Sequence, residues 1–516
     1  LREKDAQIMV VIGNPPYNVG QKSENDNNKN RSYPVIDYRI NESYAKDSRA
    51  TLNNKLYDVY VKFFRWATDR LQGRDGIICF VSNNSFVDQI AFDGMRKHFL
   101  KDFNLIYHLD LHGNVRKNPK LSGTTHNVFG IQVGVGITIA IRTSQTAERA
   151  LYYYRVPEFW RKTDKLAFLT KMSSIVGMDW IKLQPDENYT WLTEGLRSEF
   201  GIFLPMGKKE IKEAKEINAK AVFKLYSLGV ATNRDTHAYS FDPIHLRKQA
   251  GIFIDIYNIA VDRLRRLRDE VDPASLTDTT DSRIKWTRQV KASLMRLQYS
   301  EYVEVHIRNC LYRPFTRKFL YFDDFWNEER YRQHLVFPTS ASEEENQAIC
   351  LTVLGSEKPF MVLITNVIPD LHLVGAGAGT QCFPYYTYAE DGSNRRENIT
   401  DWALSQFQAK YGSEVTKWDI FHYVYAMLHH PQYRERYADN LKRDLPHIPL
   451  LHNKEAFLAC VRIGKQLMNI HLHYEQAKEY ALKWVENREV PFSWRVEKMK
   501  LSPDKTAVII NESLTL

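Results

Sequence analysis

Cysteine is scarce in this sequence, and long apolar runs are missing altogether. The 516 residues include five isolated cysteines and no CxxC pair. This scarcity argues against a disulfide framework and a cysteine zinc site, and it fits a reducing cytoplasm. No stretch approaches the roughly 18 to 20 uninterrupted apolar residues that a membrane helix needs, so no membrane partner is expected. The first residues also lack the basic start, apolar core and cleavage site of a signal peptide.

The charge balance favours a polyanionic partner. Lysine and arginine together number 71 against 62 acidic residues, which gives a formal net charge of +9. A basic excess of this kind is compatible with nucleic-acid binding. Hydrophobic residues make up 43% of the chain and charged residues 26%, which is a globular composition rather than a disordered or fibrous one. The length predicts two to four domains.

Strand-like and helix-like segments alternate over the first 145 residues. Periodicity and composition predict strands over 8–12, 76–83 and 104–111, helices over 56–71 and 89–100, and a long β pair over 128–142. Alternation of this kind is typical of a mostly parallel α/β sheet. We therefore expect an α/β fold class, with residues 1–145 as the first domain.

The pattern loses this regularity beyond residue 145, and no fixed-period repeat is present. Helices are expected over 208–222, 245–270, 284–297, 401–410, 416–429 and 455–484, and aromatic-rich strands over 319–323 and 383–388. The polar segments 272–281 and 340–346 are expected at the surface. Residues 146–516 are therefore expected to form a larger α+β domain, in which separate helical lobes are one option.

The most informative short stretch is IMVVIGNPPYNVG, in which Asn14, Pro15, Pro16 and Tyr17 follow an apolar run. Two prolines in succession stop a strand and hold an extended loop at its carboxyl end, where open α/β sheets build their sites. The Asn14 side-chain oxygen and the Pro15 carbonyl offer two acceptors to an amino group, and Tyr17 offers a flat face. The pattern suits methylation of an amine on a planar ring, such as an adenine flipped from its stack. A strand-to-loop turn without chemistry is the alternative.

This stretch resembles the catalytic motif of S-adenosylmethionine-dependent amino-methyltransferases, and later segments resemble motifs of N6-adenine DNA methyltransferases. LYDVYVKFF resembles the helix behind the methyl-donor pocket, which implies donor contacts by Asn14, Leu56 and Tyr57. GIICFVSNNSF and MRKHFL resemble the strand, loop and helix that follow. HNVFGIQVGVGI resembles the motif whose phenylalanine closes the other face of the target base, so Phe129 is expected to stack opposite Tyr17. A place in the core is the alternative for Phe129.

Further segments resemble the type ISP restriction–modification enzymes, which are single polypeptides with nuclease, helicase-like translocase, adenine methyltransferase and target-recognition domains. The segments are GQKSENDNNKN, DLHGNVRKNP, LGVATNRDTHAY, LYRPFTRKFLYFD, FPYYTY and IFHYVYAMLHHPQYRERYADNLKRDLPHIPL. The resemblance implies that residues 1–145 are the C-terminal half of a Rossmann-like adenine-N6 methyltransferase domain with the gamma-type order of motifs. Residues 146–516 would be the target-recognition domain. Duplex DNA and upstream nuclease and helicase-like domains of the same polypeptide are the implied partners.

The resemblance also implies S-adenosylmethionine as cofactor, but its main binding motif is missing. In the family a glycine-rich loop and a ribose-binding acid precede the Asn14 strand, where only thirteen residues stand. The final residues, KTAVIINESLTL, stop on a strand-like run. We therefore expect the chain to be a portion of a larger protein and to be inactive alone.

A permuted order of motifs is an alternative source of the donor loop. VGAGAGT (374–380) would then bind the donor and Glu390 the ribose. A donor-binding glycine loop should open directly into a helix. Here a β-aromatic segment with a proline follows, so a turn near DNA is the favoured interpretation.

Histidines gather in two helical segments, where aromatic packing is favoured over metal binding, and no metal site is expected. The two groups are His422, His429 and His430, and His471 and His473 with Glu475. Asp58 and Asp110 show no partner arrangement that would suggest acid–base hydrolysis.

Basic and amide side chains in loops are the candidates for DNA contact. Arginine can read guanine edges and asparagine adenine edges, whereas lysine mostly meets phosphate. The candidates are Asn27, Lys29, Arg31, Arg116 and Lys117 beside the expected base pocket, and Thr232, Asn233, Arg234, Arg313, Arg317 and Lys318 in the recognition half. A solvated charge or a turn residue is the alternative for each of them.

The sequence therefore predicts the methyltransferase and target-recognition portion of a type ISP-like enzyme. Its parent would flip an adenine out of a specific duplex site and methylate N6 with S-adenosylmethionine. Two alternatives stand beside this prediction. One is a methyltransferase acting on RNA or on a protein glutamine amide, and the other is a DNA-binding specificity module with no activity of its own.

Overall fold

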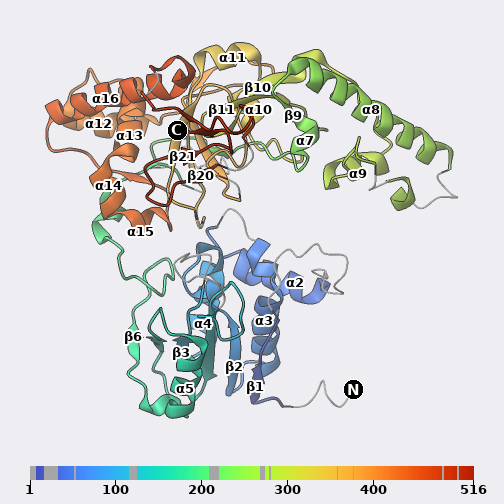
Figure 1. The fold of residues 1–516 in the computed structure, drawn as a ribbon. Helices are drawn as coiled ribbons and strands as arrows, with labels where there is room; N and C mark the ends of the chain where they lie inside the picture. The colour runs from blue at the N-terminus through green and yellow to red at the C-terminus, as the bar shows by residue number, and fades with distance from the viewer. Residues whose placement is uncertain are drawn as a thin grey trace. The chain divides into compact units, whose positions relative to one another are not determined.

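A computed structural model gives the structure of the protein (Figure 1). It describes residues 7–16, 33–50, 54–114, 125–208, 220–267, 273–277, 281–356, 358–375, 377–478, 481–496 and 499–516. The chain divides into two compact units, Leu1–Met468 and Asn469–Leu516. None of the helices in these ranges is long and apolar enough to cross a membrane.

A six-stranded sheet organises the N-terminal part of the first unit, with the order β1-β2-β4-β3-β5-β6. Its strands are β1 (Val10–Gly13), β2 (Gly76–Asn83), β3 (Leu105–Asp110), β4 (Val135–Arg142), β5 (Ala150–Arg155) and β6 (Ile181–Leu183). β1 is parallel to β2 and β3 to β5, while β4 is antiparallel to both β2 and β3. The carboxyl ends of β1, β2, β3 and β5 therefore lie at one edge of the sheet.

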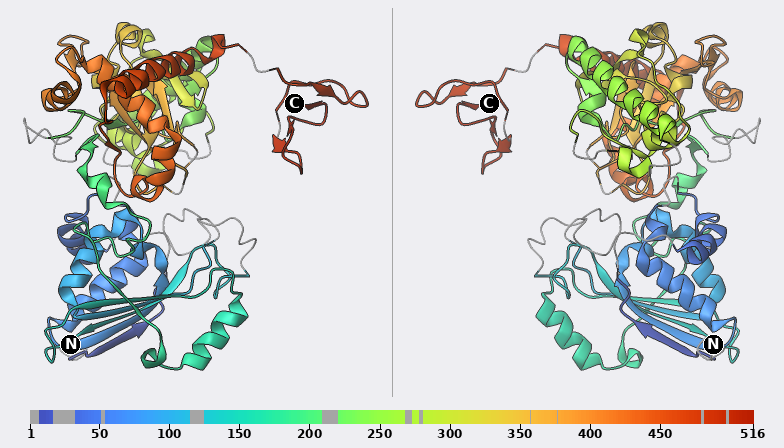
Figure 2. Two further views of the ribbon diagram at one scale, coloured as in Figure 1. Left: turned by 90° about the vertical axis from the view of Figure 1, so that its left-hand side faces the viewer. Right: turned by 90° about the vertical axis from the view of Figure 1, so that its right-hand side faces the viewer.

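Helices cover both faces of this sheet (Figure 2). They are α2 (Pro34–Ile40), α3 (Val59–Leu71) and α4 (Asp93–Asp102) on one face and α5 (Lys162–Met172) on the other. Phe64 of α3 packs against Phe80 of β2, in one apolar cluster. Phe168 of α5 packs in a second cluster with Leu109 and Val135. Successive strand residues point to opposite faces, which is why β2, β3, β4 and β5 each supply both clusters.

The C-terminal end of α3 follows from the local sequence, as predicted, and its first turn begins three residues later than predicted. Asp58 stands extended before the first turn, and Gln72 and Gly73 follow the last turn with φ angles of 51° and 77°. A left-handed residue followed by glycine is the usual way to end a helix. β2 then begins at Gly76, so the predicted helix over 56–71 and strand over 76–83 are confirmed apart from a 3-10 turn at Asn54–Tyr57.

The β pair predicted over 128–142 is wrong, because only β4 forms there. Residues 125–134 make turns instead. Gly130 has a φ of +71°, and the Gly130 N–H donates to the Asn127 carbonyl at 3.2 Å, which closes a tight turn. A β-branched and aromatic composition does not specify a strand where such a turn intervenes.

Two four-stranded sheets organise the rest of the first unit, with the orders β14-β10-β11-β9 and β13-β12-β15-β8. Their strands are β8 (Ser227–Leu228), β9 (Tyr239–Ser240), β10 (Ile307–Arg313), β11 (Thr316–Tyr321), β12 (Ala348–Thr352), β13 (Val362–Thr365), β14 (Ile368–Pro369) and β15 (Thr380–Pro384). Every residue of β12, β13 and β15 is buried. Two-stranded pairs join β16 (Tyr386–Thr387) to β17 (Arg396–Glu397) and β7 (Leu204–Pro205) to β18 (His447–Ile448).

Helices pack around these sheets. α8 (Pro243–Arg266) and α9 (Arg288–Met295) enclose Trp326, whose ring centroid lies 4.3 Å from that of Phe253. The other helices are α7 (Asp235–Ala238), α10 (Gln333–Val336), α11 (Ser340–Glu345), α12 (Asp401–Tyr411), α13 (Lys417–His429), α14 (Pro431–Arg436), α15 (Ala438–Leu441) and α16 (Lys454–Leu472). The polar segment 340–346 thus contains α11, and α16 is shorter than the predicted 455–484. The mixed α/β fold class is confirmed.

The second unit carries a small sheet with the order β19-β22-β21-β20. Its strands are β19 (Val485–Glu486), β20 (Lys500–Leu501), β21 (Val508–Ile509) and β22 (Leu514–Thr515). The rings of Trp484 and Phe492 each contact that of Trp494 edge to face.

Candidate functional site

The loop that follows β1 stands at the carboxyl edge of the six-stranded sheet. Asn14 and Pro16 have exposed side chains, and Pro15 between them is buried. Because proline has no N–H to donate, the strand ladder stops after Gly13. Tyr17 lies outside the described residues.

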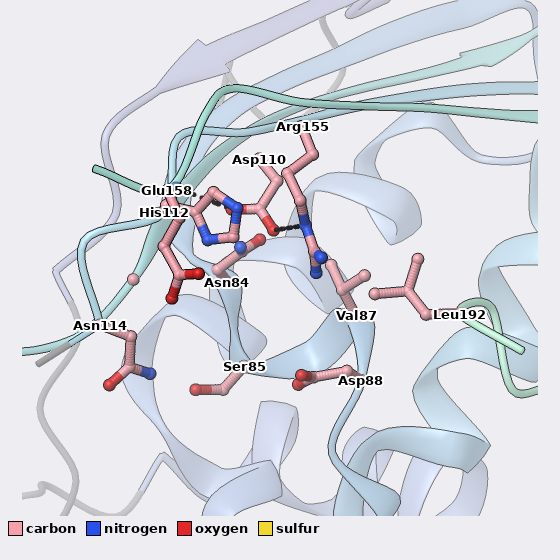
Figure 3. Close-up of a pocket in the computed structure, with 11 residues that line it drawn as sticks. Asn84, Ser85, Val87, Asp88, Asp110, His112, Asn114, Arg155, Glu158 and Leu192 are labelled. Atoms are coloured by element: carbon pink, nitrogen blue, oxygen red, sulfur yellow. Dashed lines mark hydrogen bonds and ion pairs between the residues drawn. The ribbon is translucent and has the colours of Figure 1, made fainter. Parts of the chain in front are cut away.

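A cavity of about 200 Å³ opens at the same edge, beyond the ends of β2, β3 and β5 (Figure 3). Figure 3 shows the side chains of Asp110, His112 and Asn84 grouped beside Arg155. The lining is mostly polar and consists of Asn84, Ser85, Val87, Asp88, Asp110, His112, Asn114, Gly134, Arg155, Glu158 and Leu192. It offers amide and guanidinium donors together with carboxylate acceptors, which is the chemistry that a planar heterocycle with ring nitrogens and an amino group requires.

Asp110, the last residue of β3, anchors one wall of this cavity. Its carboxylate accepts hydrogen bonds from the Tyr153 hydroxyl at 2.7 Å and the His112 N–H at 2.8 Å, and Arg155 Nε lies 3.6 Å away. Arg155 Nε also donates to the Tyr153 oxygen at 2.9 Å. Burial alone would raise the pKa of Asp110, but the charges of His112 and His108 and the Tyr153 hydrogen bond outweigh it, and the pKa is lowered. Asp110 is therefore an ionised anchor rather than a proton donor.

His108 holds a second lining residue in place. Its Nδ1 lies 2.9 Å from Thr138 Oγ1, and its Nε2 lies 2.5 Å from Asn84 Oδ1. Burial lowers the pKa of His108 to about 4, so the ring is neutral at neutral pH. The carbonyl oxygen of Asn84 can only accept, which assigns the proton to Nε2 and leaves Nδ1 to accept from the threonine hydroxyl. The Asn84 amide nitrogen is thereby left to face the cavity.

Phe129 stands on the turn that precedes β4, and its side chain is 47% exposed. The neighbouring Val128 is buried in the cluster around Leu109 and Val135. Val128 is thus anchored in the core, while the Phe129 ring stands at the surface. The alternative of a core position for Phe129 is therefore wrong.

The two residues that the resemblance assigns to the methyl donor differ in exposure. Leu56 is fully buried in the cluster under α3. Tyr57 is partly buried, and its hydroxyl lies 3.5 Å from Asn41 Oδ1. Burial, followed by the charge of Asp37, raises the pKa of Tyr57. Leu56 thus acts through packing, while Tyr57 keeps a face that a ligand can reach.

Several predicted DNA contacts lie outside the described residues. They are Asn27, Lys29, Arg31, Arg116 and Lys117.

Two of the predicted contacts in segment 232–234 are buried, which contradicts a direct approach to DNA. Thr232 is 2% exposed and Arg234 is 0% exposed. Arg234 Nη2 donates to Thr287 Oγ1, and its guanidinium lies 5.1 Å from the centre of the Phe253 ring. Burial lowers the pKa of Arg234 to about 10. Asn233 between them is exposed in a left-handed turn, with a φ of 52°, and remains a candidate.

The candidates on β10 and β11 are partly exposed. Arg313 Nη1 lies 2.6 Å from Asp370 Oδ1, and its Nη2 lies 3.7 Å from Asp235 Oδ2, so its charge is compensated within the protein. Arg317 and Lys318 stand near the start of β11 with part of each side chain at the surface. Both therefore remain candidates for contact with DNA.

The glycine-rich loop 374–380 does not have the form of a donor-binding loop. It leads into β15 and not into a helix. Gly375 and Gly377 have φ angles of +147° and +77°, and a Cβ at either position would meet nothing within 4 Å. Glu390, the proposed ribose acid of the permuted order, is paired with His334 at 3.2 Å. The permuted order thus gains no support.

The histidines of the helical segments pack against aromatic rings. His422 stacks on Trp418 with a centroid distance of 5.5 Å, and His429 meets the edge of Tyr425 at 4.6 Å. Within the described ranges, no group of three or more histidine, cysteine, aspartate or glutamate side chains is arranged to hold a metal ion.

Sequence reasoning missed the contributions of residues beyond 145 to this site. The predicted domain boundary assigns β5 and β6 to the recognition domain, yet both strands belong to the six-stranded sheet. β5 supplies Tyr153 and Arg155, and the segment after it supplies Glu158. The run ALYYYR, rich in residues that favour strands and followed by Pro157, is the signal that could have revealed β5.

Two family models match the chain. Residues 221–516 match a model described as the type ISP C-terminal specificity domain. Residues 3–115 match a model described as the Eco57I restriction-modification methylase. No curated protein sequence matches at a significant level.

Several solved structures are similar over the whole chain. The cryo-EM structure of a DrdV–DNA complex is 36% identical with a TM-score of 0.83, and the match covers 100% of this chain and 50% of that chain. A nuclease-deletion mutant of the type ISP enzyme LlaGI with a DNA substrate mimic is 33% identical, with a TM-score of 0.81 and coverages of 100% and 46%. The ATP-dependent type ISP enzyme LlaBIII bound to DNA is 30% identical, with a TM-score of 0.81 and coverages of 100% and 33%. The chain thus spans half or less of the length of each of these relatives.

Proposed function

The chain belongs to the family of type ISP restriction–modification enzymes and contains their methylase and specificity regions, and from that premise we propose that its parent protein methylates DNA. The acceptor is adenine N6 within a specific duplex site, and the donor is S-adenosylmethionine. The target base leaves its stack before the reaction, because its amino group cannot be reached inside a duplex.

The observation that carries this proposal is the position of Asn14, Pro15 and Pro16. They follow a parallel strand at the carboxyl edge of the sheet, the edge on which the polar cavity opens. Asn14 Oδ1 and the Pro15 carbonyl accept the two hydrogens of the adenine amino group, which aims the nitrogen lone pair at the donor. Tyr17 and the exposed ring of Phe129 stack on opposite faces of the base.

No side-chain base is needed for the transfer. The bound donor would supply its sulfonium methyl group to the amine nitrogen and would be left as a neutral thioether, and the methylated amine would release its extra proton to water. The two acceptors at Asn14 and Pro15 favour this course because they stabilise the positive charge that develops on the amino group. Asp110 stays ionised throughout and holds the wall of the cavity.

The residues assigned to S-adenosylmethionine fit it in part. The exposed Asn14 and the partly buried Tyr57 can meet the donor, whereas the fully buried Leu56 supports the pocket from behind. When bound, the donor supplies an electrophilic methyl group. The relatives are two to three times as long as this chain. We therefore propose that further parts of the polypeptide complete the donor site and that this chain alone is inactive.

The specificity region supplies the contacts to the duplex. The chain carries a net charge of +9, and the solved relatives were determined with DNA or a DNA mimic. Of the described candidates, Asn233, Arg313, Arg317 and Lys318 keep side-chain surface for such contacts, and Arg313 is also paired with Asp370. We place the border between methylase and specificity regions after β6 and before residue 221, where the specificity model begins. Nuclease and helicase-like domains upstream are proposed for the parent.

Methylation by the full-length protein tests the proposal directly. Duplex DNA incubated with S-adenosylmethionine should yield N6-methyladenine when its nucleosides are analysed by mass spectrometry. Asn14→Ala should lower kcat by about 100-fold or more, because one charge-stabilising acceptor is lost. Asn469→Ala, which removes an exposed amide on α16, is the matched control and should keep the wild-type rate.

Two results would contradict the proposal. An Asn14→Ala variant with the full rate would remove the catalytic role of Asn14. A full-length protein that binds its DNA site but transfers no methyl group to adenine would favour the specificity module without activity.

A further inference from the structure

The turn that presents Phe129 is tied together by one buried side chain. Asn127 is 0% exposed, and its Oδ1 accepts from the N–H groups of Phe129 at 2.9 Å and Ile131 at 3.4 Å. Its Nδ2 donates to the carbonyls of Gly113 at 3.2 Å and Val133 at 2.6 Å. Both donors and both acceptor positions of the amide are therefore used. A single side chain fixes the backbone on both sides of the Phe129 ring.

Helix α5 lies on the face of the sheet opposite to α3, and it supports the same turn. Lys165 is 0% exposed, and its Nζ lies within 2.5 Å of the His126 carbonyl oxygen. The His126 ring and the Trp160 carbonyl lie 3.2 Å apart, and the Lys162 N–H donates to the Thr125 carbonyl at 3.0 Å. Burying an ammonium group is costly unless hydrogen bonds replace its lost hydration. Here the bonds from Lys165 and Lys162 hold His126 and Thr125, the two residues directly before Asn127.

We propose that Asn127 and Lys165 are positioning residues that hold the Phe129 ring against the face of the flipped adenine. This inference rests on the proposed function, in which Phe129 stacks on the base. Neither side chain reaches the base, since both are buried behind the turn. Stacking requires the ring to be held in one plane, and an exposed ring on an unsupported turn would lose that order.

Variants that keep the size of each side chain test this role in the full-length protein. Asn127→Asp keeps an acceptor but removes both donors, and Lys165→Met keeps the stem but removes the ammonium group. We expect each to lower kcat about tenfold to 100-fold, because misplacement of about 1 Å has effects of that size. KM for DNA should change less than kcat. Lys171→Met, on the exposed side of α5, is the matched control and should keep the wild-type kcat.

A double-mutant cycle separates positioning from general stability. If both residues act through Phe129, their substitutions should have little effect in a Phe129→Ala background. There, Asn127→Asp and Lys165→Met should each lower kcat by less than about twofold. DNA with 2-aminopurine at the target position gives an optical readout, because stacking on an aromatic ring quenches its emission. Emission in the complex should rise in Phe129→Ala and rise to a similar level in Asn127→Asp.

Folded Asn127→Asp and Lys165→Met proteins with wild-type kcat would overturn the inference. The inference would also be overturned if the two substitutions lowered kcat equally in the wild-type and Phe129→Ala backgrounds. If Asn127→Asp does not fold, Lys165→Met alone decides. A wild-type protein without adenine methylation, or full activity in Phe129→Ala, would instead place the failure in the proposed function.

Discussion

Arg234 is a charged residue in an apolar setting, and its role differs from the predicted one. Its guanidinium packs over the Phe253 ring and donates to Thr287. Nε and Nη1 have no hydrogen-bond partner among the described residues. Buried nitrogens without partners reduce the stability that the side chain provides through packing.

We therefore expect opposite outcomes from two substitutions at Arg234. Arg234→Met keeps the volume of the stem and removes a buried charge, so the free energy of unfolding should stay the same or rise. Arg234→Ala leaves a cavity and should lower that free energy by about 2 to 4 kcal/mol. Urea denaturation measures both, with Arg263→Met on the exposed side of α8 as the matched control. Weaker binding of cognate DNA by a fully stable Arg234→Met would restore the predicted contact.

His108 makes the stability of the protein depend on pH. Its pKa is lowered to about 4 by burial in the folded state, against about 6.5 in an unfolded chain. The unfolded state therefore binds the proton more readily. Stability should fall as the pH drops through 6.5 and should stop falling below about 4, with a total loss of about 3 kcal/mol.

The comparison of wild type with His108→Gln isolates this contribution. Between pH 7 and pH 5 the wild-type free energy of unfolding should fall by about 2 kcal/mol more than that of the variant. His422, whose pKa burial also lowers to about 4, contributes equally to both proteins and cancels. If the free energy of unfolding depends on pH in the same way in both proteins, the pKa of His108 does not differ between the folded and unfolded states, and the prediction is wrong.

At the scale of whole elements, two glycines inside helices have opposite reasons to be there. Gly464 lies where α16 crosses α13, and a Cβ there would come within 2.0 Å of the His422 carbonyl oxygen. Gly251 lies in the middle of α8, where a Cβ would meet nothing within 4 Å. The first glycine permits a helix crossing, and the second only loosens its own helix.

Alanine at these two positions should change stability in opposite directions. Gly464→Ala forces the two helices apart and should lower the free energy of unfolding by about 1 to 3 kcal/mol. Gly251→Ala should raise it by up to about 1 kcal/mol, through helix propensity and a less flexible unfolded chain. Denaturant titration of both variants provides the measurement. A stabilised Gly464→Ala would mean that the crossing relaxes at little cost.

At the scale of the whole molecule, local signals predicted the parts of the fold that local sequence determines. The helix over 56–71 and the strand over 76–83 were predictable because their ends carry glycine and their apolar spacing is regular. The loop at Asn14 was predictable from another local signal, since consecutive prolines stop a strand wherever they occur.

Pairing between distant segments explains what was missed. Asp110 meets Tyr153 and Arg155 because β3 and β5 lie side by side in register, which no local pattern in either strand records. The burial of Arg234 likewise depends on α8 and on Thr287, far along the chain. Loops rich in polar residues have the same composition whether their side chains face solvent or fold inward.

The order of strands in the main sheet also determines when each strand can pair with its neighbours during synthesis of the chain. β3 has only β4 and β5 as its neighbours, and both are made after it. About two dozen residues separate the end of β3 from the start of β4, which a ribosome adds in about one to five seconds. During that interval β2 and β3 both have an open edge, and direct pairing between them would close the gap that β4 must enter. Maturation of the cavity wall at Asp110 is therefore a late event, and the newborn chain is most exposed to mispairing before residue 142 emerges.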